Sequence, residues 1–293
     1  MAELRGTFAV LATPFDENEE INYSGLAKNI NWNIEKGVHG IIPLGSTGEF
    51  TTLSKEESEE LLEFVIKEVD QRVPIIAGTS ADSTTEAINK SKYAESLGVD
   101  GLLVLPPYYF NPLQEEMINH YSLINDEVNI PVMVYNNPGV TGVDIQLETV
   151  LKISENDNVN YIKESTGDIT RLRDIELNKT EEITTFCGCD ELALESFFAG
   201  AQGWVSVISN AFPGLSAELF EVSVDQKDYD RAREIYNKLL PFCKELEGSG
   251  KLVQVIKYLM DKRGAVGGFS KKPKLPLTND DKYRLDQLLE RVN

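Results

Sequence analysis

The 293-residue chain has very few of the residues that most often hold catalytic metals or build disulfides. It contains two histidines and three cysteines, Cys187, Cys189 and Cys243. This histidine content gives almost no material for a zinc site built on several imidazoles. An odd number of cysteines cannot all pair, and the C-x-C spacing of Cys187 and Cys189 is poor for an unstrained disulfide, so free thiols are expected. We therefore expect no metal and no other cofactor.

Positive charge is also scarce. Lys and Arg number 28 against 48 acidic residues, which gives a formal net charge of −20. A surface this acidic disfavours nucleic acids and anionic membranes as partners. Long apolar runs are lacking as well: TFAVLATPF is interrupted at Pro14 and is too short for a signal-peptide core, and no stretch reaches the ~18–20 apolar residues of a membrane span. We expect a cytoplasmic protein.

The chain does contain enough apolar sequence for a large core, since 41% of its residues are hydrophobic. Short apolar runs bounded by Gly, Pro and polar turns alternate with amphipathic segments that have helix-capping residues. This alternation predicts parallel strands covered by helices. Eight runs are expected to be strands: residues 7–15, 40–45, 73–80, 99–107, 130–138, 159–166, 184–191 and 202–210.

Capping residues support the predicted helices. Ser24 precedes GLAKNINWNIEKG, and Asp82 precedes STTEAINKSKYAESLG. Ser54 precedes KEESEELLEFVIKEV and is followed three residues later by Glu57, the pattern of a capping box. After the eighth strand, residues 213–263 and 280–292 are expected to form further helices joined by the Gly- and Pro-rich loop GAVGGFSKKPKLPL.

Eight strand–helix units fit a closed (β/α)8 barrel, the TIM barrel, which usually takes ~250 residues. We assign residues 1–223 to the barrel and residues 224–293 to a C-terminal helical extension packed on it as a single structural unit. An open, doubly wound sheet is the alternative. That fold would require a glycine-rich phosphate-binding turn after the first strand, and TPFDENEE is nothing like one.

Lys163 is the most informative residue of the chain. It ends the apolar run VNYIK and precedes a polar Ser-Thr-Gly turn. Burial at such a place disfavours the charged ammonium and leaves a free amine that can attack a ketone. The alternative is an ordinary strand-end lysine whose side chain reaches water. The residues at the other strand ends decide between these interpretations.

Polar side chains at the carboxyl ends of barrel strands are expected to converge on one active-site mouth. Tyr135 ends the run PVMVY, and its phenol can relay protons with another hydroxyl, for which Ser46 and Tyr109 are candidates. The turn GSTG at residues 45–48 offers hydroxyls and backbone N–H groups that suit a carboxylate. A buried structural tyrosine and an ordinary strand-to-helix turn are the respective alternatives.

Two acids follow the seventh strand. Asp190 and Glu191 suit substrate hydroxyls or an ammonium group, although we favour Asp190 as the N-cap of the helix ELALESFFAG. Together with Glu164 they weakly favour a substrate with a hydroxylated or amine-bearing tail.

The motifs GSTGE, YYFNP, YNNPGVTG and IKESTGD, in this order and at strand ends, resemble those of the dihydrodipicolinate synthase / N-acetylneuraminate lyase superfamily of class I, pyruvate-type lyases. The resemblance implies that Lys163 forms an imine with a 2-oxo acid and that Tyr135 is the general acid/base. It implies Ser46 and Tyr109 as relay partners, with Tyr109 supplied by a neighbouring subunit of a homodimer or homotetramer. It also implies that Ser46 and Thr47 bind the substrate carboxylate. The other expected substrate contacts are Gly45, Val140, Ser165, Asp190, Glu191 and Val205.

These motifs leave the substrate open. The lysine-precursor synthase usually has an arginine where this chain has Val140, which cannot pair with a carboxylate. The sialic acid lyase usually has Thr and Ser where this chain has Ser165 and Val207, although Gly-x-Asp-Glu is kept at residues 188–191. We therefore expect a catabolic branch, such as a 2-keto-3-deoxy sugar acid aldolase or dehydratase or a hydroxyproline-pathway deaminase. Both named enzymes, and a 2-oxo acid sensor without turnover, are the alternatives.

Overall fold

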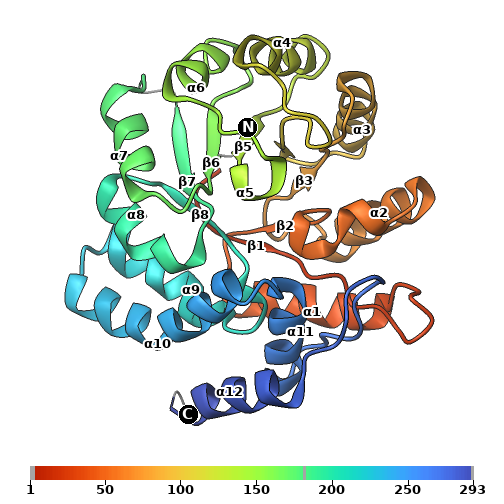
Figure 1. Ribbon diagram of the computed structural model, residues 1–293, viewed down its shortest axis with the longest axis vertical. Helices are drawn as coiled ribbons and strands as arrows, with labels where there is room; N and C mark the ends of the chain where they lie inside the picture. Colours follow the sequence, from red (N-terminus) through yellow and green to blue (C-terminus); the bar gives the residue numbers. More distant parts are fainter. Residues whose placement is uncertain (1–3, 181–182, 292–293) are drawn as a thin grey trace. The chain divides into compact units, whose positions relative to one another are not determined.

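The computed structural model describes residues 4–180 and 183–291 of the chain. Within these ranges eight strands form one parallel sheet in the order β2-β1-β8-β7-β6-β5-β4-β3, and helices alternate with them along the chain (Figure 1). This is the predicted (β/α)8 barrel class. The strands are β1 (Gly6–Val10), β2 (Gly40–Ile42), β3 (Ile76–Gly78), β4 (Gly101–Val104), β5 (Val132–Asn136), β6 (Tyr161–Glu164), β7 (Thr184–Cys187) and β8 (Gly203–Ser206).

Each strand lies inside or within one residue of its predicted run, but it is shorter. The difference lies mostly at the carboxyl ends, where the chain stays buried after the ladder of hydrogen bonds has stopped. After β8, for example, the residues Ile208–Asn210 form a single turn of 3-10 helix and all three are buried. A run of apolar residues indicates that a segment is buried, and it does not distinguish a strand from a buried turn.

The described residues group into two compact units. The first contains residues 4–5 and 74–205, and the second contains residues 6–73 and 206–291. The assignment of residues 1–223 to the barrel and 224–293 to an extension stays a proposal, and its outermost residues, 1–3 and 292–293, lie outside the described ranges.

In the first unit, helices cover the outer side of the strands β3 to β7 (Figure 1). The side chains of β4, β5 and β6 are buried along their whole length, as expected for parallel strands covered on both faces. Close packing requires a glycine at position 203 in β8, because a Cβ there would lie 2.2 Å from the ring of Phe186 in β7. The helices are α3 (Thr84–Ser96), α4 (Gln114–Asn125), α5 (Pro138–Thr141), α6 (Leu147–Ile153), α7 (Ile169–Asn178) and α8 (Ala193–Ala199).

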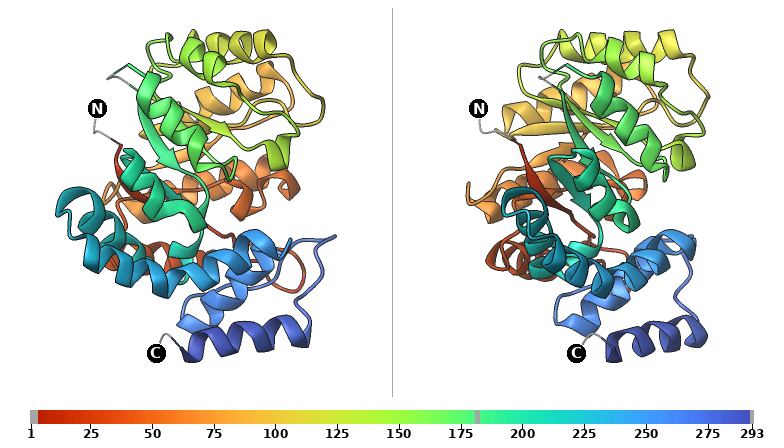
Figure 2. Two further views of the ribbon diagram at one scale, coloured as in Figure 1. Left: turned by 60° about the vertical axis from the view of Figure 1, so that its left-hand side comes forward. Right: turned by 90° about the vertical axis from the view of Figure 1, so that its left-hand side faces the viewer.

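In the second unit, Asn210 ties the chain after β8 to β1. Its Nδ2 donates to the carbonyl of Val10 at 2.8 Å, and its Oδ1 accepts from the N–H of Ala12 at 3.2 Å. Figure 2 shows α12 beside the other C-terminal helices, where the Tyr258 hydroxyl bonds the Asp286 carboxylate at 2.9 Å. The helices are α1 (Tyr23–Glu35), α2 (Lys55–Val69), α9 (Pro213–Phe220), α10 (Tyr229–Gly248), α11 (Leu252–Arg263) and α12 (Asn279–Glu290).

The helix caps confirm one prediction and correct two. Ser54 and Glu57 form the predicted capping box at α2. Helix α1 is capped by Asn22, whose Oδ1 accepts from Gly25 N–H at 2.9 Å, and not by Ser24. Helix α3 is capped by Ser83, and not by Asp82, whose carboxylate instead accepts the N–H of Tyr109 at 3.0 Å. In both cases a neighbouring Asn or Ser offers the same short polar cap, so the sequence alone leaves the position ambiguous.

No helix in the described part of the chain is both long enough and apolar enough to cross a membrane.

Candidate active site

Strands β5 and β6 bring Tyr135 and Lys163 together. The two residues are partners in the register of these parallel strands, so their side chains leave the same face of the sheet. Each is only 5% exposed. The Nζ atom of Lys163 lies 3.6 Å from the centre of the Tyr135 ring. The two residues that the sequence selects most strongly are therefore direct neighbours.

The phenol of Tyr135 has a partner that the sequence analysis missed. Asn137 Nδ2 donates a hydrogen bond to Tyr135 Oη at 2.9 Å. Asn137 belongs to the YNNPG motif, where Tyr135 alone had been selected. The only signal that points to Asn137 is its position two residues after the tyrosine, at the end of a strand.

Gly188, directly after β7, makes room for Lys163. A Cβ at this position would lie 2.9 Å from Lys163 Cε and 1.8 Å from Ser165 Oγ. The lysine chain and the Ser165 hydroxyl thus both approach the Cα of Gly188, and any side chain there would displace them. Ser165 Oγ is buried and forms no hydrogen bond with any described residue, which leaves it open to a ligand.

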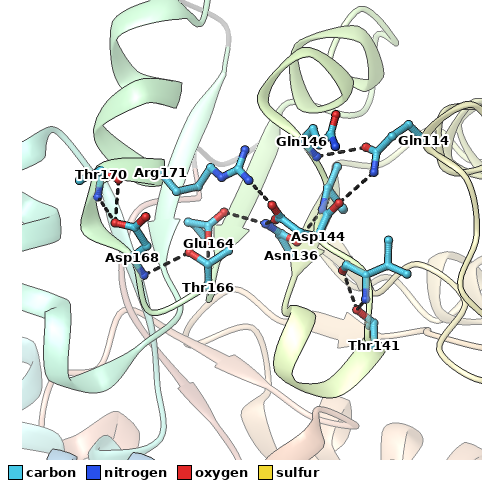
Figure 3. Close-up of polar contacts among 12 residues, drawn as sticks. Gln114, Asn136, Thr141, Asp144, Gln146, Glu164, Thr166, Asp168, Thr170 and Arg171 are labelled. Atoms are coloured by element: carbon cyan, nitrogen blue, oxygen red, sulfur yellow. Dashed lines mark hydrogen bonds and ion pairs between the residues drawn. The ribbon is translucent and has the colours of Figure 1, made fainter.

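The opposite face of β5 and β6 carries a polar network (Figure 3). Asn136 Nδ2 donates to Glu164 Oε2 at 3.0 Å and to Asp144 Oδ1 at 2.9 Å, and Glu164 Oε1 accepts the N–H of Thr166 at 2.7 Å. Burial raises the pKa of Glu164, and the hydrogen bonds from Thr166 and Asn136 oppose that rise. Because successive strand residues face opposite sides, Glu164 points away from Lys163. Glu164 therefore gives no support to a substrate with a hydroxylated or amine-bearing tail.

The same network fixes the segment between α5 and α6. Arg171 of α7 forms an ion pair with Asp144 Oδ2 (Figure 3). Gln114 of α4 donates to the Asp144 carbonyl at 2.9 Å and accepts the N–H of Gln146 at 3.1 Å. The chain that follows Tyr135 is therefore held by helices α4 and α7 as well as by its own strand.

The GSTGE turn lies in the second unit, after β2. Ser46–Gly48 form one turn of 3-10 helix, and Leu44 and Glu49 have positive φ angles of 58° and 61°. Gly45 is needed there, since a Cβ would lie 2.5 Å from Val10 Cγ2. Thr47 is buried, and Ser46 Oγ is buried without a hydrogen-bond partner among the described residues. The first N–H groups of a helical turn lack internal partners, so the turn suits a carboxylate.

Glu49, the last residue of this motif, is surrounded by lysines. Its carboxylate lies 2.6 Å from Lys257 Nζ and 2.9 Å from Lys274 Nζ, and it accepts the N–H of Lys271 at 3.2 Å. Burial lowers the pKa of Lys257 to about 8, although the Glu49 carboxylate opposes this. This cluster was not predicted from the sequence. Its only signal is the KKPK run in the C-terminal loop.

The prediction that Asp190 caps the helix after β7 was wrong. Its side chain does not cap α8, whose N-cap position is Leu192 without a side-chain hydrogen bond. Asp190 is 1% exposed, and its Oδ1 accepts the indole N–H of Trp204 at 2.9 Å. A buried carboxylate with this partner has a structural task in joining the chain after β7 to β8.

The other candidates differ in exposure. Val205 is fully buried in β8, and Glu191 is half-buried in the turn after β7. Val140 lies in α5 and is 53% exposed, and Tyr109 is 90% exposed. Over residues 4–180 and 183–291, no group of three or more His, Cys, Asp or Glu side chains is placed to hold a metal ion.

The family model described as the dihydrodipicolinate synthetase family matches residues 3–292. The chain belongs to this family. Members of the dihydrodipicolinate synthetase family are class I lyases, which agrees with the predicted class of enzyme.

Among curated relatives, the 4-hydroxy-tetrahydrodipicolinate synthase of Pseudomonas putida is 37% identical over 275 residues, which is 94% of this chain and 92% of that protein. The synthase of the same name from Methanococcus maripaludis is 35% identical over 290 residues, 99% of each chain. These names agree with the synthase alternative of the sequence analysis and not with the catabolic branch that it preferred.

Two solved structures of this family are very similar. The chloride-inhibited dihydrodipicolinate synthase of Acinetobacter baumannii, complexed with pyruvate, has a TM-score of 0.95 and 32% identity, with 99% of both chains covered. The 4-hydroxy-tetrahydrodipicolinate synthase of Methylacidiphilum fumariolicum has a TM-score of 0.94 and 35% identity, covering 99% of this chain and 96% of that one.

Proposed function

We propose that the protein joins Lys163 to a 2-oxo acid of the pyruvate type as an imine, and makes or breaks a bond next to the resulting enamine. One observation carries this proposal: the Lys163 Nζ atom lies 3.6 Å from the centre of the Tyr135 ring, and both residues are buried on neighbouring strands. A buried amine beside a phenol supplies the nucleophile and the proton donor that imine formation needs. The relative from Acinetobacter baumannii, which binds pyruvate, supports the substrate class.

The chemistry follows from these groups. The neutral amine of Lys163 attacks the ketone carbon, and the carbinolamine then loses water as Tyr135 delivers a proton to the departing hydroxyl. The protonated imine withdraws electrons from the neighbouring carbon, which can lose a proton to give the enamine. The enamine attacks an electrophile, or it forms when a C–C, C–O or C–N bond breaks. Water finally releases the product and restores the amine.

We assign the remaining roles on the family resemblance. Ser46 and Thr47 bind the substrate carboxylate, and two features support this role: the buried Ser46 hydroxyl without a described partner and the helical turn of Ser46–Gly48. Ser46 and Tyr109 relay protons for Tyr135, with Tyr109 reaching a neighbouring subunit of a homotetramer, consistent with its 90% exposure. Ser165 contacts the substrate next to the imine, and Gly45, Val140, Glu191 and Val205 shape the site. Asp190 stays a candidate substrate contact, although its Oδ1 accepts the indole N–H of Trp204.

Two substrates compete. The names of the curated relatives favour condensation of pyruvate with aspartate semialdehyde, the reaction of the dihydrodipicolinate synthase. Val140 favours the second candidate, a catabolic enzyme that cleaves, dehydrates or deaminates a hydroxylated 2-oxo acid. It occupies the place of the arginine expected in the synthase, and an aliphatic side chain cannot pair with a distal carboxylate.

The imine is tested by borohydride reduction in the presence of pyruvate, followed by mass mapping of the peptides. We expect a pyruvate adduct on Lys163 in the native protein and none in the Lys163→Ala variant, with both proteins folded by circular dichroism. A folded native protein whose Lys163 stays unmodified would contradict the proposal.

The two substrates are separated by a panel assay. Pyruvate with aspartate semialdehyde is compared with 2-keto-3-deoxy sugar acids and with amine-bearing 2-oxo acids. Robust condensation in the first assay supports the synthase. Turnover restricted to the other substrates, with condensation gained in a Val140→Arg variant, supports the catabolic enzyme.

A further inference from the structure

The proposed mechanism gives no task to Asn137 of the YNNPG motif. The backbone of Asn137 caps the start of α5. Its carbonyl accepts hydrogen bonds from the N–H groups of Val140 and Thr141, each at 3.0 Å, and from the Thr141 hydroxyl at 3.1 Å. The Asn137 side chain forms no capping bond to this helix. Since any residue supplies a carbonyl, the local fold does not explain why an amide side chain stands here.

The side chain of Asn137 instead contacts Tyr135. Its Nδ2 lies 2.9 Å from Tyr135 Oη in a partly buried environment. An amide nitrogen can only donate, so the phenol oxygen is the acceptor in this bond. The hydrogen of the phenol is then available to another acceptor, as a proton donor requires.

The consequence is electrostatic as well as geometric. A donor to the phenol oxygen is worth more when that oxygen carries negative charge, because hydrogen bonds to charged groups are stronger. In the protonated imine the Lys163 nitrogen is positively charged, and its position over the same ring then adds a second interaction that favours a negative phenol oxygen. When Tyr135 gives up a proton, the phenolate is therefore stabilised both at its oxygen, by Asn137, and at its ring, by Lys163.

We propose that Asn137 is a positioning residue of the catalytic centre, which orients the Tyr135 phenol and stabilises the phenolate formed when Tyr135 delivers its proton. The inference rests on the proposed function, because it assigns Tyr135 the role of general acid/base. Asn137 acts through Tyr135.

The test uses hydrogen–deuterium exchange at the methyl group of pyruvate, followed by NMR in D2O across a range of pH. Exchange reports enamine formation and needs no second substrate. Asn137→Asp replaces the donor with an acceptor of the same shape, whose charge opposes the phenolate. We expect exchange to slow about tenfold and the pH profile of the exchange rate to change, because the added carboxylate opposes a negative phenol oxygen. Asn137→Ala removes one hydrogen bond, and exchange should slow roughly three- to tenfold.

Gln146→Glu is the matched control. It adds the same negative charge nine positions further along the chain, on an exposed residue that forms no hydrogen bond with Tyr135 in the described part of the chain. This control should keep the native rate and pH profile. Asn137 variants that are folded and match the control in both rate and pH profile would overturn the inference.

The borohydride experiment separates this inference from the proposed function. A native protein that forms the Lys163 adduct while the Asn137 variants exchange normally would sink the role of Asn137 alone. A native protein that forms no adduct would overturn both.

Discussion

The two compact units each bury a glutamate directly beside a predicted site segment, and they satisfy it in opposite ways. Glu164 follows Lys163, and its hydrogen-bond donors among the described residues are the neutral Asn136 amide and Thr166. Glu49 follows Ser46–Gly48 and lies among the ammonium groups of Lys257 and Lys274. The two side chains are comparably buried, at 5% and 2% exposure.

The difference concerns what each carboxylate needs in order to stay buried. Neutral donors hold the Glu164 carboxyl in place whether or not it carries a proton, and its raised pKa shows that burial disfavours the charge. Glu49 depends on opposite charge, so losing its buried partner Lys257 leaves the carboxylate with only the more exposed Lys274 ammonium to compensate it. Both arrangements fix a backbone segment, but only the second is fragile to the loss of a single cation.

The largest effect should come from Lys257→Met. Lys257 is 2% exposed, and its ammonium bonds both Glu49 and the carbonyl of Phe269. Removing one partner of a buried pair typically costs about 3–5 kcal/mol. We expect the free energy of unfolding, measured by urea denaturation, to fall by this amount. The double variant Glu49→Gln, Lys257→Met should recover a large part of the loss.

Lys262→Met is the control on the same helix. Its ammonium pairs with Asp286 at 2.9 Å, but both side chains are more than a third exposed. Exposed pairs contribute about 0–1 kcal/mol. A Lys257→Met protein as stable as the Lys262→Met protein would show that the buried cluster carries no special weight.

A smaller effect, with a defined pH dependence, is expected for Glu164→Ala. Leaving the Asn136 and Thr166 donors unsatisfied should cost about 1–3 kcal/mol. The pKa of Glu164 is raised in the folded protein, so its contribution to stability is fully present below the unfolded value near 4.5 and is lost as the pH rises through the folded value. The difference in unfolding free energy between native and variant protein should therefore be larger near pH 5 than near pH 8. The opposite slope would contradict a raised pKa.

The features predicted correctly from the sequence are those that depend on the order of residues and on local patterns. Strand periodicity placed Lys163 and Tyr135 at the ends of neighbouring strands, and Ser54 with Glu57 marked the start of α2. The missing parts depend on contacts between distant segments. Glu49 and Lys257 are 208 positions apart, and nothing in either neighbourhood predicts their pairing. Glu164 was grouped with the site acids by its position at a strand end, although strand alternation already places it on the face opposite Lys163.

The smallest effect is expected for Lys274→Met, which removes the second cation of the Glu49 cluster. Lys274 is 29% exposed at its side chain and lies 2.9 Å from Glu49, while Lys257 keeps its own bond at 2.6 Å. Water screens the outer pair, so the loss should be about 1 kcal/mol or less and should shrink in 1 M salt. A loss as large as that of Lys257→Met, unchanged by salt, would mean that Glu49 requires both cations equally. The neutral hydrogen bonds of Glu164 would then contrast with a Glu49 cluster in which both ammonium groups contribute equally. The expected contrast is with a cluster in which the buried Lys257 contributes most of the stability.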